Sequence, residues 1–230
     1  MRLETVRLLT GDLAAQASFY GEVLGLRVVE RTATLVVVQA GATRLAWAAA
    51  AQGWRGAYHF AFNIPKNKLA EAKRWAAERV PLIRSAAGDD EFVFANWDAR
   101  AVYFYDAAGN IVELIARRAL NNAAEAAFGG AQILEVSELG LASADVPATV
   151  QLCRAALGVD VFRGSSGEAF AAVGDDHGLF IIVREGRLWY PDTGVPADPL
   201  PVEATVNLGA GTRFVLSGPP YRVVPETRRA

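Results

Sequence analysis

One helical segment occurs twice in the chain, and this internal repeat restricts the possible folds more than any other feature of the sequence. Asp12 precedes an apolar run with helical spacing that ends at Gly25, and Asp145 precedes a similar run that ends at Gly158. Aspartate is a preferred residue before a helix, and glycine is a preferred residue after one. At one constant offset, six residues have counterparts: Asp12, Leu13, Ala17, Tyr20, Leu24 and Gly25 correspond to Asp145, Val146, Val150, Cys153, Leu157 and Gly158. The sequence therefore predicts a duplicated structural unit.

The regions around the first helix are rich in strand-forming residues. Residues 5–9 alternate as a strand does, and three β-prone runs follow between residues 26 and 47. The same order of elements restarts at residue 58. There the sequence predicts a strand over 58–63, a helix capped by Asn67 that runs to about Val80, strands near 82–83 and 92–94, and a hairpin through 103–113. Residues 1–118 are thus predicted to form two β-α-β-β-β units.

The second half of the chain is predicted to be a trimmed version of the first. Residues 119–132 contain asparagine, alanine and glycine runs that are typical of a linker. After the repeated helix come three strands and a proline-rich loop, and the strand at 202–206 leads to a hairpin without a helix. We therefore expect a first domain over residues 1–118, a linker over 119–132 and a second, truncated domain over 133–230. The predicted fold class is α+β, with tandem paired β-α-β-β-β units.

The overall composition excludes several classes of function. The 230 residues carry a formal net charge of −2 with scattered basic residues, so there is no electrostatic footprint for nucleic acid. No apolar run approaches the roughly 20 residues of a membrane-spanning helix, and the charged start of the chain is unlike a signal peptide. The single cysteine, Cys153, lies among apolar helix positions and is expected in the core. We expect a cytoplasmic protein that binds neither nucleic acid nor membrane.

A hairpin near the end of the first half places a carboxylate on a strand. Tyr103 to Tyr105 is aromatic and strand-prone, Gly109 suits the turn, and the alternation resumes at Ile111. Glu113 therefore lies on a strand, where a charged side chain is expected to face solvent or to have a partner. This position is compatible with a Glu113 side chain on a solvated strand face and with one that acts as a ligand inside a cavity.

Three segments together resemble the vicinal oxygen chelate superfamily, which includes glyoxalases, bleomycin-resistance proteins and extradiol dioxygenases. They are the first strand and helix with Phe19-Tyr20 and Leu24-Gly25-Leu26, the strand His59-Phe60-Ala61-Phe62, and the hairpin from Asp106 to Leu114. The resemblance covers nearly all of the first half, and the repeat extends it to the second. It implies that paired units form curved sheets, two cups in this chain, around a metal or a small ligand. One fold of this kind supports many activities.

The resemblance also implies a metal site in the first cup. The family's ligands would be a histidine in the first strand, a histidine in the strand that opens the second unit, and a glutamate after the hairpin. The last two correspond to His59 and Glu113, while the first position holds Thr5. A divalent Fe, Mn or Zn ion would then be bound by His59 and Glu113, with Thr5 or water completing the shell, and Tyr103 would supply a hydrogen bond or a proton. This set implies a metal-dependent glyoxalase-like lyase or ring-cleaving dioxygenase whose substrate the sequence does not name.

Other side chains support a second interpretation. Strand alternation puts His59 and Asn63 on the concave face. Arg7 shares the face of Thr5, where its guanidinium would pair with Glu113, hold an anionic group of a ligand, or lie at the sheet edge as a solvated charge. Trp47 is expected to line a pocket for a flat apolar ligand. A metal-free protein that binds or sequesters a small molecule, like the bleomycin-resistance branch, is then the alternative to an enzyme.

The second half is expected to be mainly structural. Glu138 occupies the place equivalent to Thr5 and is expected to be exposed or paired with an arginine. His177 lies in a turn rich in glycine and aspartate and is expected at the surface. A third alternative is a structural protein whose exposed sheet edges assemble into a homodimer.

Overall fold

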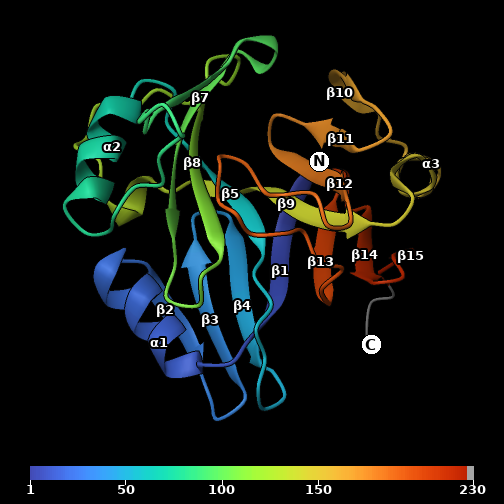
Figure 1. Ribbon diagram of the computed structural model, residues 1–230, viewed down its shortest axis with the longest axis horizontal. Coiled ribbons are helices and arrows are strands. Elements are labelled where there is room, and N and C mark those ends of the chain that lie inside the picture. Colours follow the sequence, from blue (N-terminus) through green and yellow to red (C-terminus); the bar gives the residue numbers. More distant parts are fainter. Residues whose placement is uncertain (227–230) are drawn as a thin grey trace.

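The computed structural model describes residues 1–226, which form two large curved sheets with helices packed against them (Figure 1). The strand order is β15-β14-β13-β1-β4-β3-β2 in a seven-stranded sheet and β10-β11-β12-β9-β5-β8-β7-β6 in an eight-stranded sheet. This arrangement confirms the predicted α+β fold of paired β-α-β-β-β units with curved-sheet cups.

The seven-stranded sheet joins the beginning of the chain to its end. Strand β1 pairs in parallel with β4 and antiparallel with β13, so the first and last units lie side by side (Figure 1). Its strands are β1 (Arg2–Thr10), β2 (Arg27–Arg31), β3 (Leu35–Ala40), β4 (Thr43–Ala49), β13 (Val202–Asn207), β14 (Arg213–Gly218) and β15 (Arg222–Pro225).

The eight-stranded sheet joins the two central units. Strand β5 pairs in parallel with β8 and antiparallel with β9, which places the second and third units edge to edge. Its strands are β5 (His59–Ile64), β6 (Phe92–Phe94), β7 (Ala99–Tyr105), β8 (Ile111–Arg117), β9 (Glu135–Ser143), β10 (Val161–Ser166), β11 (Phe170–Asp175) and β12 (Gly178–Arg184). Each sheet thus contains strands from both halves of the chain, and independent domains over 1–118 and 133–230 stay a prediction.

The predicted repeat is visible in the matching ends of two helices. Helix α1 (Leu13–Ser18) continues as a π-helical turn over Phe19–Val23, and α3 spans Val146–Leu157. The carboxylate of Asp12 accepts a hydrogen bond from the Ala15 amide, and that of Asp145 accepts one from the Ala148 amide, both at 2.9 Å. Gly25 and Gly158 follow the helices with φ of 66° and 65°, a left-handed conformation that glycine adopts without strain.

The second unit differs from the sequence prediction in two places. Helix α2 (Leu69–Ala77) has no side-chain cap, because Oδ1 of Asn67 accepts a hydrogen bond from the Ala124 amide instead. The prediction of Asn67 as the cap is therefore wrong. Residues 82–83 form no strand within the described chain, only an isolated bridge between Leu82 and Phe104. None of the helices in residues 1–226 is long and apolar enough to cross a membrane.

The two faces of β5 belong to different apolar clusters. Phe60 and Phe62 lie in the main core, which contains side chains from both sheets and from all three α-helices of the described chain. Ala61 lies in a smaller cluster with Tyr103 and Trp189 on the opposite face. The alternation predicted for this strand is therefore confirmed. The candidate site lies on the face of Ala61.

Candidate functional site

Three neighbouring strands bring one imidazole and two carboxylates together. Ala61 on β5 is paired with Glu113 on β8 and with Glu138 on β9. His59 lies two residues before Ala61 and so points to the same face of the sheet. All three ionisable side chains are buried, and the small side chain of Ala61 leaves the space between the two glutamates free.

A β-bulge lies beside Glu138. Ala61 pairs with Glu138, but Phe62 pairs with Val136, so Ser137 is an extra residue on β9. Bulges bend a strand and change the direction of the neighbouring side chains, and they are frequent next to active sites. Here the bulge lies beside the position from which Glu138 projects.

The donor atoms of these side chains lie close to one another. The Nε2 atom of His59 is 3.8 Å from Oε2 of Glu113 and 4.0 Å from Oε2 of Glu138. One ligand atom from each residue lies within 4.8 Å of the others. Ligands bound to one metal ion at about 2.1 Å are separated by about 3 Å, so modest side-chain movements would bring this group to coordination distance.

The environment of His59 keeps its imidazole neutral and oriented. Its Nδ1 atom lies 3.2 Å from the Ile111 carbonyl oxygen, which can accept a hydrogen bond when the ring proton is on Nδ1. Burial lowers the pKa of His59 to about 4, and the hydrogen bond to Ile111 opposes this shift only in part. The Nε2 lone pair then points toward the carboxylates, as in histidines whose other nitrogen is fixed by a carbonyl group.

The negative charges of Glu113 and Glu138 repel each other, which disfavours ionisation of both carboxyl groups. Burial is the largest cause of the raised pKa of Glu113, the charge of Glu138 adds to it, and a hydrogen bond from Tyr103 opposes it. Burial likewise raises the pKa of Glu138, against the opposing charge of Arg117. The Oε1 atom of Glu113 is buried without a hydrogen-bond partner. A bound cation would satisfy this oxygen and offset the repulsion.

Arg117 is a fully buried cation beside this group. It lies on β8 four residues after Glu113, and its Nη2 donates to Oε1 of Glu138. Its Nε donates to Oδ1 of Asn63 at 3.2 Å. A buried ion pair is stable only when added hydrogen bonds satisfy its remaining donors, and here Asn63 supplies one, while Nη1 of Arg117 is buried without a partner among the described residues. When both glutamates are ionised and His59 is neutral, the positive charge of Arg117 compensates only one of the two carboxylates.

A cavity of about 440 Å³ opens above the three donors. Its walls are mainly aromatic: Phe94, Trp97, Tyr103, Phe170, Trp189 and Tyr190. The Trp189 ring lies 5.2 Å from the His59 ring, between centroids. A β-carbon on Gly140 would lie 2.7 Å from Cη2 of Trp189, so only glycine allows this ring to pack there. The volume is within the range of small-molecule sites, about 300 to 1,000 Å³.

Comparison with known proteins places this fold in a family. Residues 2–114 match the model of the Glyoxalase/Bleomycin resistance protein/Dioxygenase superfamily. Residues 2–114 of the chain therefore belong to this superfamily, the vicinal oxygen chelate proteins. None of the curated proteins matches it.

Solved structures of this superfamily share the fold over most of the chain. A candidate dioxygenase from Bacillus subtilis subsp. subtilis str. 168 is 14% identical, with a TM-score of 0.62 over 94% of this chain and 81% of that chain. A single-residue variant of glyoxalase I from Zea mays is 13% identical, with a TM-score of 0.55 over 97% of this chain and 91% of that chain. At such identities the likeness concerns the fold alone.

The structure brings together some of the predicted vicinal oxygen chelate residues and separates others. His59, Glu113 and Tyr103 line one cavity. Thr5 and Arg7 lie on β1 in the other sheet, because the first unit pairs with the fourth and not with the second. Arg7 is exposed and therefore pairs neither with Glu113 nor with a ligand in this cavity.

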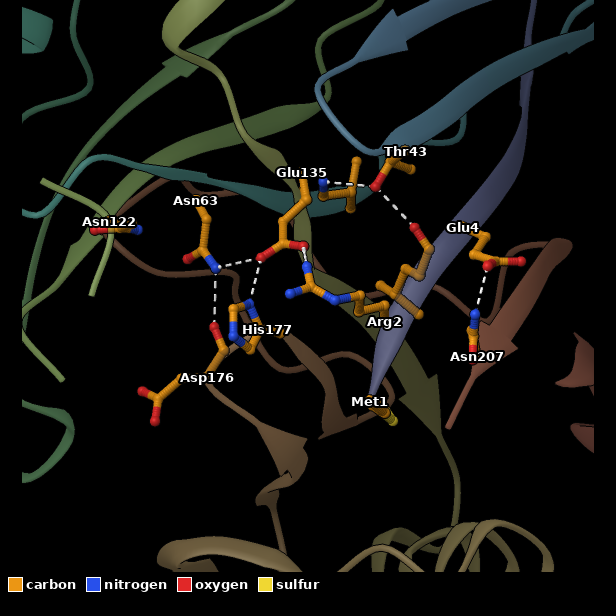
Figure 2. Close-up of polar contacts among 12 residues, drawn as sticks. Met1, Arg2, Glu4, Thr43, Asn63, Asn122, Glu135, Asp176, His177 and Asn207 are labelled. Atoms are coloured by element: carbon orange, nitrogen blue, oxygen red, sulfur yellow. Dashed lines mark hydrogen bonds and ion pairs between the residues drawn. The ribbon is translucent and has the colours of Figure 1, made fainter. Parts of the chain in front are cut away.

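Two further predicted residues lie away from the cavity. Trp47 is buried in the main core, where its ring stacks on Tyr20 with 4.2 Å between centroids. Asn63 is on the expected face but its amide donates to Glu135 and to the Asp176 carbonyl, in a network that also contains Arg2 and His177 (Figure 2). Both side chains therefore have structural partners.

Glu138 and Arg117 were not expected in the site. Glu138 was predicted to be exposed or paired with an arginine, and the second alternative is confirmed, since Glu138 is buried and paired with Arg117. The constant offset of the repeat makes Glu138 the counterpart of Thr5, and this offset is the signal that could have located it. The alternation of β8 puts Arg117 on the face of Glu113, which could have indicated its position.

Proposed function

We propose that the protein is a metal-dependent enzyme of the glyoxalase or dioxygenase type, with a divalent metal bound by His59, Glu113 and Glu138. The convergence of three buried donor atoms within 4.8 Å at the base of a cavity carries this proposal. Superfamily membership supports the reaction type. Fe(II), Mn(II) and Zn(II) all accept imidazole and carboxylate ligands, so the donor set fits each of them.

The chemistry of the donors fits a cation. His59 is neutral, and its Nε2 atom faces two carboxylates whose buried charges repel each other. The unpartnered Oε1 atom of Glu113 is a further acceptor that the described side chains leave unsatisfied. Ligand atoms of this kind bind a metal only when deprotonated, so binding would release protons and become stronger as the pH rises.

The surrounding side chains would prepare a substrate for reaction. A divalent metal bound there supplies Lewis-acid polarisation of substrate oxygens. Burial raises the pKa of Tyr103 well above its usual value, so its hydroxyl stays protonated and can donate to Glu113 or to a substrate oxygen. Trp189 and Tyr190 cover one wall and reduce the access of water.

The proposal is tested by anaerobic reconstitution with Fe(II), Mn(II) or Zn(II), followed by metal analysis and thermal unfolding. We expect one bound equivalent, and stabilisation by about 2.7 kcal/mol at a free metal concentration 100 times Kd. His59→Ala, Glu113→Gln and Glu138→Gln should each lose both effects. Glu135→Gln is the matched control, because Glu135 is a buried carboxylate on the same strand that is paired with Arg2. Wild-type protein that retains no metal, or variants that are stabilised as strongly as wild type, would contradict the proposal.

A second candidate is a metal-free protein that binds or sequesters a small molecule. The observation that favours it is the buried ion pair of Arg117 and Glu138, which already compensates one of the two carboxylate charges. In that case protein treated with a chelator would bind its ligand as tightly as untreated protein. Binding that requires added metal would exclude this candidate.

A further inference from the structure

The charges around the cavity are distributed unevenly. The carboxylates of Glu113 and Glu138 lie at the buried end, and the exposed Arg187 lies at the cavity wall. Among the described residues that line the cavity, Arg187 is the only one with a permanent positive charge. In the metal-free protein, an anionic group of a ligand would be repelled by the ionised carboxylates and attracted by this guanidinium. The cavity therefore favours one orientation of an anionic ligand.

The surroundings of Arg187 leave its donors available. Its guanidinium carbon lies 5.3 Å from the centroid of the Phe170 ring, so one planar face of the group is covered by the ring. In the part of the chain that the structure describes, it forms no ion pair with an acidic side chain, unlike Arg163 with Asp176. The N–H groups at the edge of a guanidinium match the geometry of a carboxylate.

The backbone holds Arg187 in place at the base of the loop that covers the site. Its amide donates to the Arg184 carbonyl at 3.0 Å, and its carbonyl accepts from the Ala197 amide at 2.8 Å. The Trp189 amide donates to the Val195 carbonyl at 2.9 Å in the same loop. Arg187 and Trp189 are thus fixed relative to each other by one short segment.

The walls between the two charged ends suit a flat apolar body. Trp97 stacks on Phe170 with 6.3 Å between centroids and an interplanar angle of 27°, which extends the aromatic surface next to Arg187. Aromatic walls with a few placed polar groups are typical of sites for small planar ligands. We propose that the cavity binds a planar aromatic carboxylate, with the carboxylate on Arg187 and the opposite end of the ring system facing His59. This inference rests on the proposed function, since it assigns the substrate class of the same site.

The test uses a pair of probes that differ in charge but not in shape. Binding of 2-naphthoate and of 2-naphthamide to the metal-free full-length protein is measured by calorimetry and by quenching of tryptophan fluorescence. We expect 2-naphthoate to bind at least tenfold more tightly than the amide, and the difference to shrink as salt is added. Arg187→Gln should remove the preference while leaving amide binding unchanged. Arg184→Gln is the matched control, because Arg184 is a nearby exposed arginine that donates to the Glu168 carbonyl and does not line the cavity.

The outcomes separate this inference from the metal proposal. If His59→Ala, which cannot bind metal at the site, keeps the preference for 2-naphthoate, the anion position stands whether or not the wild-type protein binds metal. Equal binding of the two probes by wild type, no binding of either, or an undiminished preference in Arg187→Gln would overturn the inference. An Arg187→Lys variant that restores part of the preference would support it.

Discussion

The two sheets share a local backbone arrangement but carry different side chains at its centre. In each sheet, one residue of a central strand is flanked by residues of two neighbouring strands. The central residue and its antiparallel partner are Ala61 and Glu138 in the eight-stranded sheet and Thr205 and Thr5 in the seven-stranded sheet. The other neighbour differs, because Glu113 lies on a strand parallel to β5, whereas Val215 lies on a strand antiparallel to β13. The two sheets therefore share one antiparallel strand pair, which carries Glu138 in one sheet and Thr5 in the other, while the parallel neighbour that carries Glu113 is present beside β5 and not beside β13.

The two sheets share a β-bulge at this place but differ at the position that His59 occupies. The extra residue of the bulge is Ser137 in the eight-stranded sheet and Glu4 in the seven-stranded sheet, at corresponding positions of the repeat. Two residues before the central position, the eight-stranded sheet has His59 and the seven-stranded sheet has Glu203. Duplication thus preserved the central strand pair and its bulge, while the side chains of His59, Glu113 and Glu138 distinguish the candidate metal site from the other sheet.

The sheets also differ in what covers them. The loop after β12 places Trp189 over His59, and Gly140 provides the space for its ring. At the constant offset of the repeat, the counterpart of Gly140 is Arg7, which is exposed. In the eight-stranded sheet, burial therefore raises the pKa of both glutamates and lowers that of His59, whereas the counterpart position in the other sheet holds an exposed arginine. The loop that covers the site and the candidate ligand residues are thus found in the same sheet.

The largest expected effect comes from removing the buried cation. Arg117→Met leaves the charge of Glu138 buried without its partner, so we expect a loss of about 3 to 5 kcal/mol in the free energy of unfolding. Arg213→Met in the other sheet breaks the partly exposed pair with Glu4 and should cost less than about 1 kcal/mol. Urea unfolding of both variants at pH 7 gives the comparison. Adding Glu138→Gln to Arg117→Met should restore much of the loss, and equal losses in the two sheets would refute the contrast.

A smaller effect is expected from filling the space under Trp189. A β-carbon in Gly140→Ala would lie 2.7 Å from Trp189 and 3.0 Å from the His59 carbonyl oxygen, so the ring must move. We expect a loss of about 1 to 3 kcal/mol and a changed tryptophan emission maximum. Arg7→Ala, at the counterpart position, should stay within about 0.5 kcal/mol of wild type. Thermal unfolding followed by fluorescence measures both, and an unchanged spectrum for Gly140→Ala would argue against close packing.

The smallest effect concerns pH, and its sign should differ between the sheets. The pKa of Glu113 is raised above its usual 4.5, so its ionisation destabilises the metal-free folded protein increasingly as the pH rises above 4.5. Glu113→Gln should therefore become steadily more stable relative to wild type as the pH rises from 4.5 to 8.

The pKa of Glu4 is lowered, chiefly by hydrogen bonding to Arg213, so its contribution is present above pH 4.5 and is lost as the pH falls through the lowered pKa. Glu4→Gln should therefore lose stability relative to wild type as the pH rises through the lowered pKa toward 4.5, by less than about 1 kcal/mol, and the difference should change little above pH 4.5. Urea unfolding of metal-free proteins at several pH values gives both slopes. Slopes of the same sign would show that the two carboxylates have similar environments.

Local patterns in the sequence predicted the elements but not their partners. The caps at Asp12 and Asp145 and the alternation of His59 with Phe60 depend on neighbouring residues only, so they could be read directly. The pairing of β5 with β9 is a long-range property that no local pattern specifies. The sequence therefore led to Thr5 as the third ligand position, whereas the strand order brings its repeat counterpart, Glu138, beside His59.

The most direct test of the central claim is anomalous X-ray diffraction from crystals grown with Mn(II) or Zn(II). The account predicts a single strong peak within about 2.3 Å of Nε2 of His59 and of one carboxylate oxygen each of Glu113 and Glu138. It also predicts no peak at the corresponding position beside Thr5 in the seven-stranded sheet. A cavity without a peak at saturating metal, or a peak at Thr5 instead, would contradict it.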